Sequence, residues 1–156
     1  MNNRKILEIG RKVIKNEREV YKGIPSFFVH STEVVHGDLG MLKPEDVVIG
    51  FSNSGETQEV INLLPILKRR GIRIIALTSK ENSTLGENSD ITINIGCNKE
   101  ACPFNLVSTS SSTATLVLGD ALVLTSSQIK AFTKEEYALD HPGGSLGEKI
   151  RELLNN

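Results

Sequence analysis

The stretch that decides the fold is VVIGFSNSGETQEVINLLPILKRRG, which runs from Val47 to Gly71. Its first five residues form an apolar run, which is typical of a strand covered on both faces. A polar turn, Ser52 to Thr57, comes next, and apolar residues then recur at helical spacing. Gly71 follows three cationic residues and marks the end of that helix. The stretch therefore predicts a strand, a turn and a helix in succession.

Further strands and helices alternate on both sides of this stretch. Apolar or β-branched runs predict additional strands at residues 26–30, 72–78 and 91–95. Helical patterns cover residues 3–20, 57–70, 82–88, 112–130, 133–139 and the last segment of the chain. The segment 112–130 is apolar on nearly all sides, which predicts burial at the centre of the domain or in an oligomer interface. Alternation of this kind predicts an α/β fold, with a parallel sheet and helices on both of its faces.

The composition is that of a soluble globular protein. The chain has 156 residues, of which 38% are hydrophobic and 24% charged, so we expect a single domain over residues 1–156. Within it we expect an N-terminal helix in residues 1–22, and the sheet with the functional motifs in residues 23–156. The net charge of −1 gives no electrostatic reason to expect binding to nucleic acid or to an anionic membrane.

The sequence also lacks the signals of membrane insertion and of metal binding. No apolar run reaches the roughly 18 residues of a membrane span, and residues 1–20 lack the apolar stretch of a signal peptide. We therefore expect a cytoplasmic protein. Cys97 and Cys102 are the only cysteines, and their spacing predicts two free thiols rather than a metal site or a disulfide framework.

The turn between the first strand and its helix is the candidate binding site. Ligands of open α/β sheets bind beyond the carboxyl ends of the strands, and a helix start offers free N–H groups to a phosphate. Glycine lets the backbone approach a ligand closely, and hydroxyls donate hydrogen bonds to it. The predicted phosphate ligands are Ser52, Asn53, Ser54, Gly55 and Thr57.

An ordinary capped helix is the alternative interpretation of this turn. In that case Ser54 or Thr57 is the N-cap, and Glu56 serves the helix dipole. A second hydroxyl cluster, STSSST at residues 108–113, favours the binding site, and it adds Ser110 and Ser111 as predicted contacts. Two hydroxyl-lined helix starts on one sheet predict a small phosphorylated sugar as the ligand.

Five motifs, in this order, resemble one known family. They are PSFFVHSTEVVHGDLG (25–40), SNSGET (52–57), KEACP (99–103), STSSSTATLVLGDAL (108–122) and HPGGSLG (141–147). Together they resemble the SIS (sugar isomerase) domain family, and within it the arabinose 5-phosphate isomerases. The resemblance runs from about residue 23 to about residue 154. It implies a flavodoxin-like, three-layer αβα sandwich, a homotetramer, and interconversion of D-ribulose 5-phosphate and D-arabinose 5-phosphate toward Kdo for lipopolysaccharide or capsule.

The chain departs from this family in two places. Many members carry a pair of CBS domains after the isomerase domain, so the chain resembles the short form without them. The family also has a strand and a Gly-Lys-Ser-Gly loop ahead of the PSFFVH segment, and the loop lysine contacts substrate. Here the predicted N-terminal helix runs almost directly into residues 23–25, and the first strand, loop and lysine have no counterpart.

The resemblance also implies a set of catalytic residues. Aldose–ketose isomerisation through an enediol needs a general base near C1 and C2 and proton carriers at O1 and O2, without a cofactor. The positions that match the family are His36, Glu59 and His141. We assign His141 as the base, Glu59 as its acid/base partner and His36 as a substrate-positioning residue. Without the resemblance, an exposed first-turn glutamate and two solvated loop histidines would explain these residues equally well.

Two other functions remain open at this stage. The first is a non-catalytic sugar-phosphate binder, which has the same fold but lacks the lysine loop. The second is a different phosphosugar isomerase of the SIS family.

Overall fold

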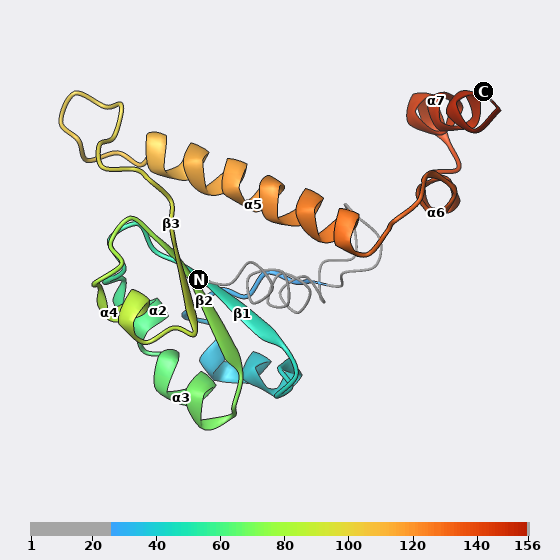
Figure 1. The fold of residues 1–156 in the computed structure, drawn as a ribbon. Helices are drawn as coiled ribbons and strands as arrows, with labels where there is room; N and C mark the ends of the chain where they lie inside the picture. Colours follow the sequence, from blue (N-terminus) through green and yellow to red (C-terminus); the bar gives the residue numbers. More distant parts are fainter. Residues whose placement is uncertain (1–25, 156) are drawn as a thin grey trace.

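A three-stranded parallel sheet forms the centre of the chain. The computed structural model describes residues 26–155, so the predicted helix at 3–20 and the junction at 20–24 lie outside the described residues. The strands are β1 (Val47–Phe51), β2 (Arg73–Thr78) and β3 (Ile91–Asn94), in the order β1-β2-β3. All pairs are parallel, which confirms the predicted α/β class (Figure 1).

The strand predicted at residues 26–30 is wrong. Ser26 forms an isolated bridge, and residues 27–30 have no regular structure. Phe28 is 79% exposed, so the apolar character of this segment is not used in a sheet. Residues 27–30 pair with none of the three strands in the described part of the chain, and a β-rich run that does not pair does not form a strand. Within residues 26–155 the sheet contains only the three strands above.

The single helix predicted at residues 57–70 is two helices. They are α2 (Gln58–Ile61) and α3 (Leu64–Arg69), and Pro65 lies in the first turn of α3. Proline has no N–H, and its ring collides with the carbonyl four residues earlier, here that of Ile61. The apolar periodicity continues through the break, which is why the pattern alone predicts one helix.

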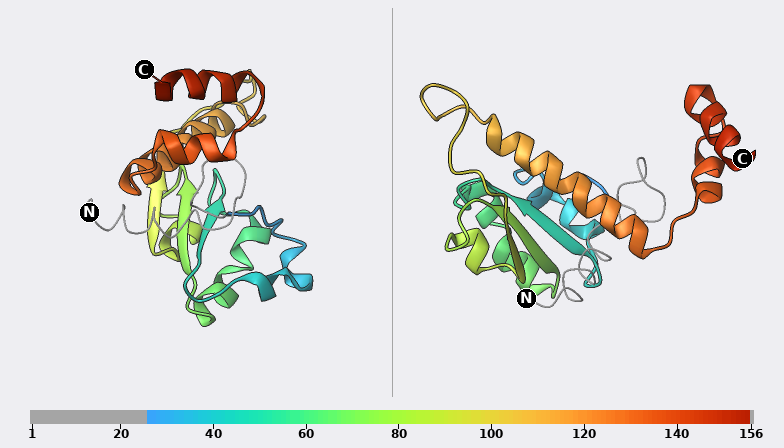
Figure 2. Two further views of the ribbon diagram at one scale, coloured as in Figure 1. Left: turned by 90° about the vertical axis from the view of Figure 1, so that its right-hand side faces the viewer. Right: turned by 45° about the horizontal axis from the view of Figure 1, so that its top comes forward.

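Two hydrophobic clusters cover opposite faces of the sheet. Side chains alternate along β2, so Ile74 and Ala76 face one side while Ile75 and Leu77 face the other. The first side is covered by α3 and by α4 (Thr84–Glu87), which contribute Leu67 and other leucines. The second is covered by α5 (Ser110–Ile129) through Leu118 and Val123. The two clusters confirm three layers around a parallel sheet (Figure 2).

The face of α5 that points away from the sheet is exposed. Leu116, Val117 and Leu124 are 69%, 62% and 51% exposed, and only Ser111 and Ser126 are buried. Burial at the centre of the domain is therefore wrong for this helix, because α5 contacts the sheet along one side only. The other predicted environment, an oligomer interface, stays a prediction.

The last two helices form an arm beyond α5. They are α6 (Lys134–Asp140) and α7 (Gly144–Asn155), which contact each other and stand away from the sheet in Figure 1 and in the right-hand view of Figure 2. In the described range, residues 26–155, no helix combines the length and the apolar character needed to cross a membrane.

Candidate functional site

The turn between β1 and α2 is held by its own hydroxyls. The Gly55 N–H donates to Ser52 Oγ at 3.0 Å, and the Glu56 N–H donates to Ser54 Oγ at 3.2 Å. The hydroxyls of Ser52 and Thr57 lie 2.7 Å apart. Thr57 is the N-cap residue of α2, yet its side chain makes no cap bond. The start of α2 therefore has no side-chain cap, unlike the ordinary capped helix considered above.

The last residue of β2 and the residue that follows it hold this turn by hydrogen bonds to Asn53. The Ser79 N–H donates to the Asn53 carbonyl at 3.0 Å, and the Thr78 hydroxyl donates to the same oxygen at 3.2 Å. The Ser79 hydroxyl donates to Asn53 Oδ1 at 2.7 Å. The register explains the contact, because Phe51 pairs with Leu77 and the next residues of both strands continue side by side. Asn53 is thus bonded to the protein through both of its carbonyl oxygens.

The fold requires glycine at position 55, whether or not a ligand is bound. Its φ is +70°, and a Cβ at this position would lie 1.8 Å from the Ser83 hydroxyl oxygen. The Leu85 N–H donates to the Gly55 carbonyl at 3.0 Å. The Thr84 N–H donates to Glu56 Oε1 at 2.7 Å, and this bond lowers the pKa of Glu56 below its ordinary value. The turn and the start of α4 therefore form one packed unit.

A polar cavity opens beside this unit, at the carboxyl edge of all three strands. Its volume is about 530 Å³, and the side chains that line it are polar or charged. They include Ser54, Glu56, Ser79, Lys80, Asn82 and Asn94. Among them, only Ser54 is a ligand predicted from the sequence. The signal for Ser79, Lys80 and Asn82 is the polar stretch TSKENS at residues 78–83, because the carboxyl ends of neighbouring parallel strands share one edge of a sheet.

The structure places Glu59 next to the turn. It lies in the first turn of α2, two residues beyond Thr57, and its side chain is exposed. Of the three predicted catalytic residues, it is the one that the structure brings to the predicted phosphate ligands.

His36 lies at the amino-terminal end of the strands, opposite to the end that carries the turn. It belongs to η1 (Val34–His36), which contacts η2 (Asp38–Met41). The guanidinium of Arg70 donates to the carbonyls of Leu39 and Leu42, which ties this segment to the end of α3 just before β2 begins. His36 is exposed there, and within one chain it is not brought to the turn.

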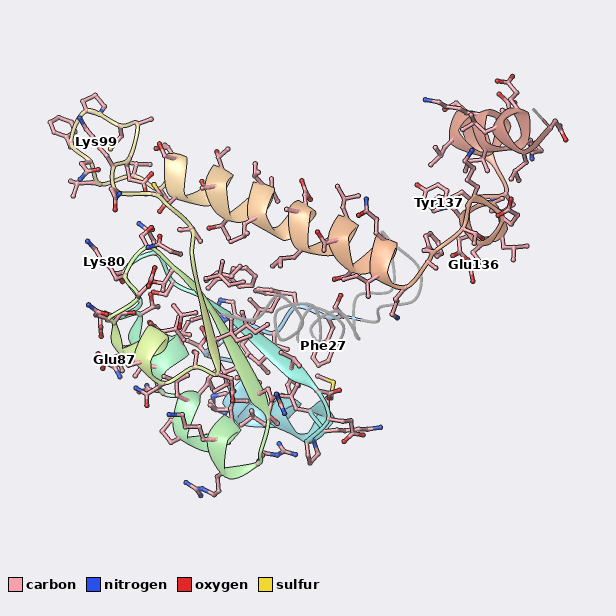
Figure 3. All side chains as sticks on the ribbon, viewed as in Figure 1. Phe27, Lys80, Glu87, Lys99, Glu136 and Tyr137 are labelled. Atoms are coloured by element: carbon pink, nitrogen blue, oxygen red, sulfur yellow. The ribbon has the colours of Figure 1, made fainter. Side chains whose placement is uncertain are left out.

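His141 lies on the arm. It follows α6, its Nδ1 lies 3.1 Å from the Tyr137 carbonyl oxygen, and its ring stacks on the Tyr137 ring with centroids 4.2 Å apart. A Cβ on Gly147 would come within 2.6 Å of the His141 carbonyl, so the loop is pressed against α7. Figure 3 shows Tyr137 on the arm and Lys80 at the far side of the chain. Within one chain, His141 and Glu59 are apart.

The N-terminal end of α5 binds the carboxylate of Glu100, where a phosphate of the ligand was predicted. Glu100 is buried, and its Oε2 accepts the Thr109 N–H at 2.8 Å, the Thr109 hydroxyl at 3.1 Å and the Ser111 N–H at 3.2 Å. Bonds from the Ser111 hydroxyl and the Thr109 N–H are the largest causes that lower the pKa of Glu100 to about 2. The sequence interpretation missed Glu100. The phosphate contacts assigned to Ser110 and Ser111 stay a prediction, and the Ser111 N–H is already engaged.

Glu100→Gln is expected to lower the melting temperature at pH 6 and to matter progressively less toward pH 2. The folded-state pKa of Glu100 lies below its ordinary value of 4.5, so its ionised form stabilises the native state above pH 4.5. That stabilisation disappears as the pH falls from 4.5 through 2. Thermal melts of the wild type and of Glu100→Gln across this pH range measure the difference in melting temperature. A difference that stays constant with pH would contradict the role of the charge.

The described residues contain no group of three or more His, Cys, Asp or Glu side chains that could hold a metal ion. Cys97 and Cys102 are both free. The N–H groups of Leu106 and Val107 donate to the Cys102 sulfur at 3.0 and 3.1 Å, and the Val107 bond is the largest cause that lowers the pKa of this thiol.

Known proteins match the chain in sequence and in fold. The family model described as SIS domain matches residues 14–125. The arabinose 5-phosphate isomerase KdsD of Yersinia pestis is 50% identical over 128 residues, which cover 82% of this chain and 39% of that protein. KdsD of Escherichia coli K12 is 47% identical over 148 residues, covering 95% and 44%. The chain thus spans about two fifths of the length of these curated relatives.

A solved structure adds a ligand to this comparison. The c3406 protein of Escherichia coli CFT073, solved in complex with arabinose 5-phosphate, superposes with a TM-score of 0.74 at 42% identity. The match covers 89% of this chain and 69% of that one.

Proposed function

The chain belongs to the SIS domain family, and on that basis we propose that it interconverts D-ribulose 5-phosphate and D-arabinose 5-phosphate. The observation that carries the proposal is the clamped turn of residues 52–57, with Glu59 two residues beyond it. The KdsD relatives and the arabinose 5-phosphate complex of c3406 support the choice of substrate. The reaction belongs in the cytoplasm and leads toward Kdo for lipopolysaccharide or capsule.

The mechanism moves one proton between two neighbouring carbons. The phosphate is held by the hydroxyls of Ser52, Ser54 and Thr57 and by the N–H groups at the start of α2. A base removes the proton from C2 of the open-chain aldose, which gives the enediol, and returns it to C1 to give the ketose. In the proposal His141 is this base, Glu59 carries a proton between O1 and O2, and His36 positions the substrate.

A complete site requires more than one chain in this proposal. His36, Glu59 and His141 are apart within a single chain, so a homotetramer brings them together. The exposed apolar side chains of α5, among them Leu116 and Val117, offer a surface for such an assembly.

A non-catalytic sugar-phosphate binder is the second candidate. It is favoured by the absence of a counterpart to the family's lysine loop in the sequence, and by the separation of the two histidines from Glu59 within one chain. The turn and its clamp would serve this function without change.

Two measurements on the same preparation separate the candidates. A coupled assay follows conversion of ribulose 5-phosphate, and a thermal-shift titration follows binding of arabinose 5-phosphate. The isomerase proposal expects both turnover and a stabilising shift that saturates with ligand. A saturating shift without turnover would favour the binder, and a protein that shows neither turnover nor a shift would exclude both.

A further inference from the structure

The cavity beside the turn contains one cationic side chain, Lys80. It is the second residue after β2, and its side chain is exposed (Figure 3). The two carboxylates on the cavity wall already have partners, since Glu56 accepts the Thr84 N–H and Glu81 accepts from the Asn94 amide at 3.1 Å. No hydrogen bond or ion pair joins the Lys80 ammonium to any of the described residues 26–155.

The backbone of Lys80 is fixed relative to the turn. Its N–H donates to the Thr78 hydroxyl at 3.1 Å, and its carbonyl accepts the Ser83 N–H at 3.1 Å. The neighbouring residue, Ser79, is buried and bonded to Asn53 of the turn. The Lys80 side chain is therefore a flexible stem on a backbone that is fixed to the turn, and Lys80 and Ser54 line the same cavity.

The turn itself brings no positive charge. Its hydroxyls and N–H groups can bond the oxygens of a phosphate, but its one ionisable residue is Glu56. A dianionic phosphate beside this carboxylate needs a cation close by. A lysine acts on phosphate as a mobile point charge and requires no fixed geometry.

We propose that Lys80 is a binding residue for the phosphate group of a ligand held at the Ser52–Thr57 turn. The inference rests on the proposed function only in taking a sugar phosphate as the ligand. The cavity then receives the phosphate between the hydroxyls of the turn and the ammonium of Lys80. The ammonium compensates the negative charges of the phosphate and of Glu56.

Three lysine variants test this role by calorimetric titration. The ligands are arabinose 5-phosphate, inorganic phosphate and unphosphorylated arabinose, each measured at low and at high salt on the full chain. The variants are Lys80→Gln, Lys80→Arg and the control Lys43→Gln. Lys43 is also exposed, but it precedes β1 and so lies at the amino edge of the sheet. Each Gln variant removes one positive charge from the chain.

Lys80→Gln is expected to lower the affinity for arabinose 5-phosphate and for inorganic phosphate about tenfold at low salt, and to reduce the salt dependence of binding. Lys80→Arg should retain wild-type affinity, and arabinose should bind Lys80→Gln and the wild type alike. Equal affinities in Lys80→Gln and Lys43→Gln would overturn the proposal, as would wild-type protein that does not bind phosphate. If Lys80→Gln loses affinity for the phosphate-containing ligands in a protein that shows no turnover, the role of Lys80 is supported. That result would contradict only the isomerase proposal.

Discussion

Gly55→Ala will abolish sugar-phosphate binding and lower the melting temperature of the protein. Residue 55 has a φ of +70°, and a left-handed non-glycine residue costs about 1–3 kcal/mol. The added Cβ would also lie 1.8 Å from the Ser83 oxygen and 2.4 Å from the Ser83 Cβ. Because Ser83 caps α4 through the Gly86 N–H, relieving the clash disturbs both the turn and that helix. Thermal melts and arabinose 5-phosphate titrations measure the two losses.

Gly71→Ala is the matched control for this variant. Gly71 has a φ of +68°, and its added Cβ would meet no atom within 4 Å. It therefore reports the cost of the left-handed backbone alone, far from the turn. The double variant Gly55→Ala/Ser83→Gly should recover part of the lost stability. If Gly55→Ala and Gly71→Ala have the same effect, the packing of Ser83 on the turn does not matter.

Glu59→Gln and His141→Asn should each lower kcat by about 10²–10⁴, the range for loss of a general acid or base. Each variant should still bind inorganic phosphate, since neither side chain belongs to the turn. Full activity of His141→Asn would remove this residue as the base.

Mixing the two inactive variants tests whether the residues act between chains. Co-expressed Glu59→Gln and His141→Asn chains can assemble with one intact site built from a wild-type Glu59 and a wild-type His141. Partial activity of the mixture is the expected result. Activity no higher than that of either variant alone would place both residues of each site on one chain.

The strands could be predicted because each depends on a local run of residues. The segments 47–51, 72–78 and 91–95 are apolar or β-branched, and the structure has β1, β2 and β3 there. Residues 26–30 have the same character but form no strand. Strand pairing depends on a neighbour, which a local pattern does not specify. Pro65 illustrates the opposite error, since one residue interrupts a helix whose periodicity continues beyond it.

The candidate site could be predicted only where it is continuous in sequence. Glu59 is only two residues beyond the turn of residues 52–57, and the two lie together. The clamp by Ser79 and the positions of Lys80 and Ser83 depend on the register of β1 against β2, which no local pattern contains. Glu100 was missed for the same reason, because its partners Thr109 and Ser111 are close only when the intervening loop folds back.

The clamp between the turn and residues 78–85 also determines how this turn can be transplanted. A graft of SNSGET alone into another α/β scaffold would lose the bonds from Ser79 to Asn53 and the packing of Ser83 on Gly55. The smallest portable unit is therefore two adjacent strand ends with their loops. Protein engineers should move both segments together, and substitutions at positions 53, 55, 79 and 83 should be chosen as a set.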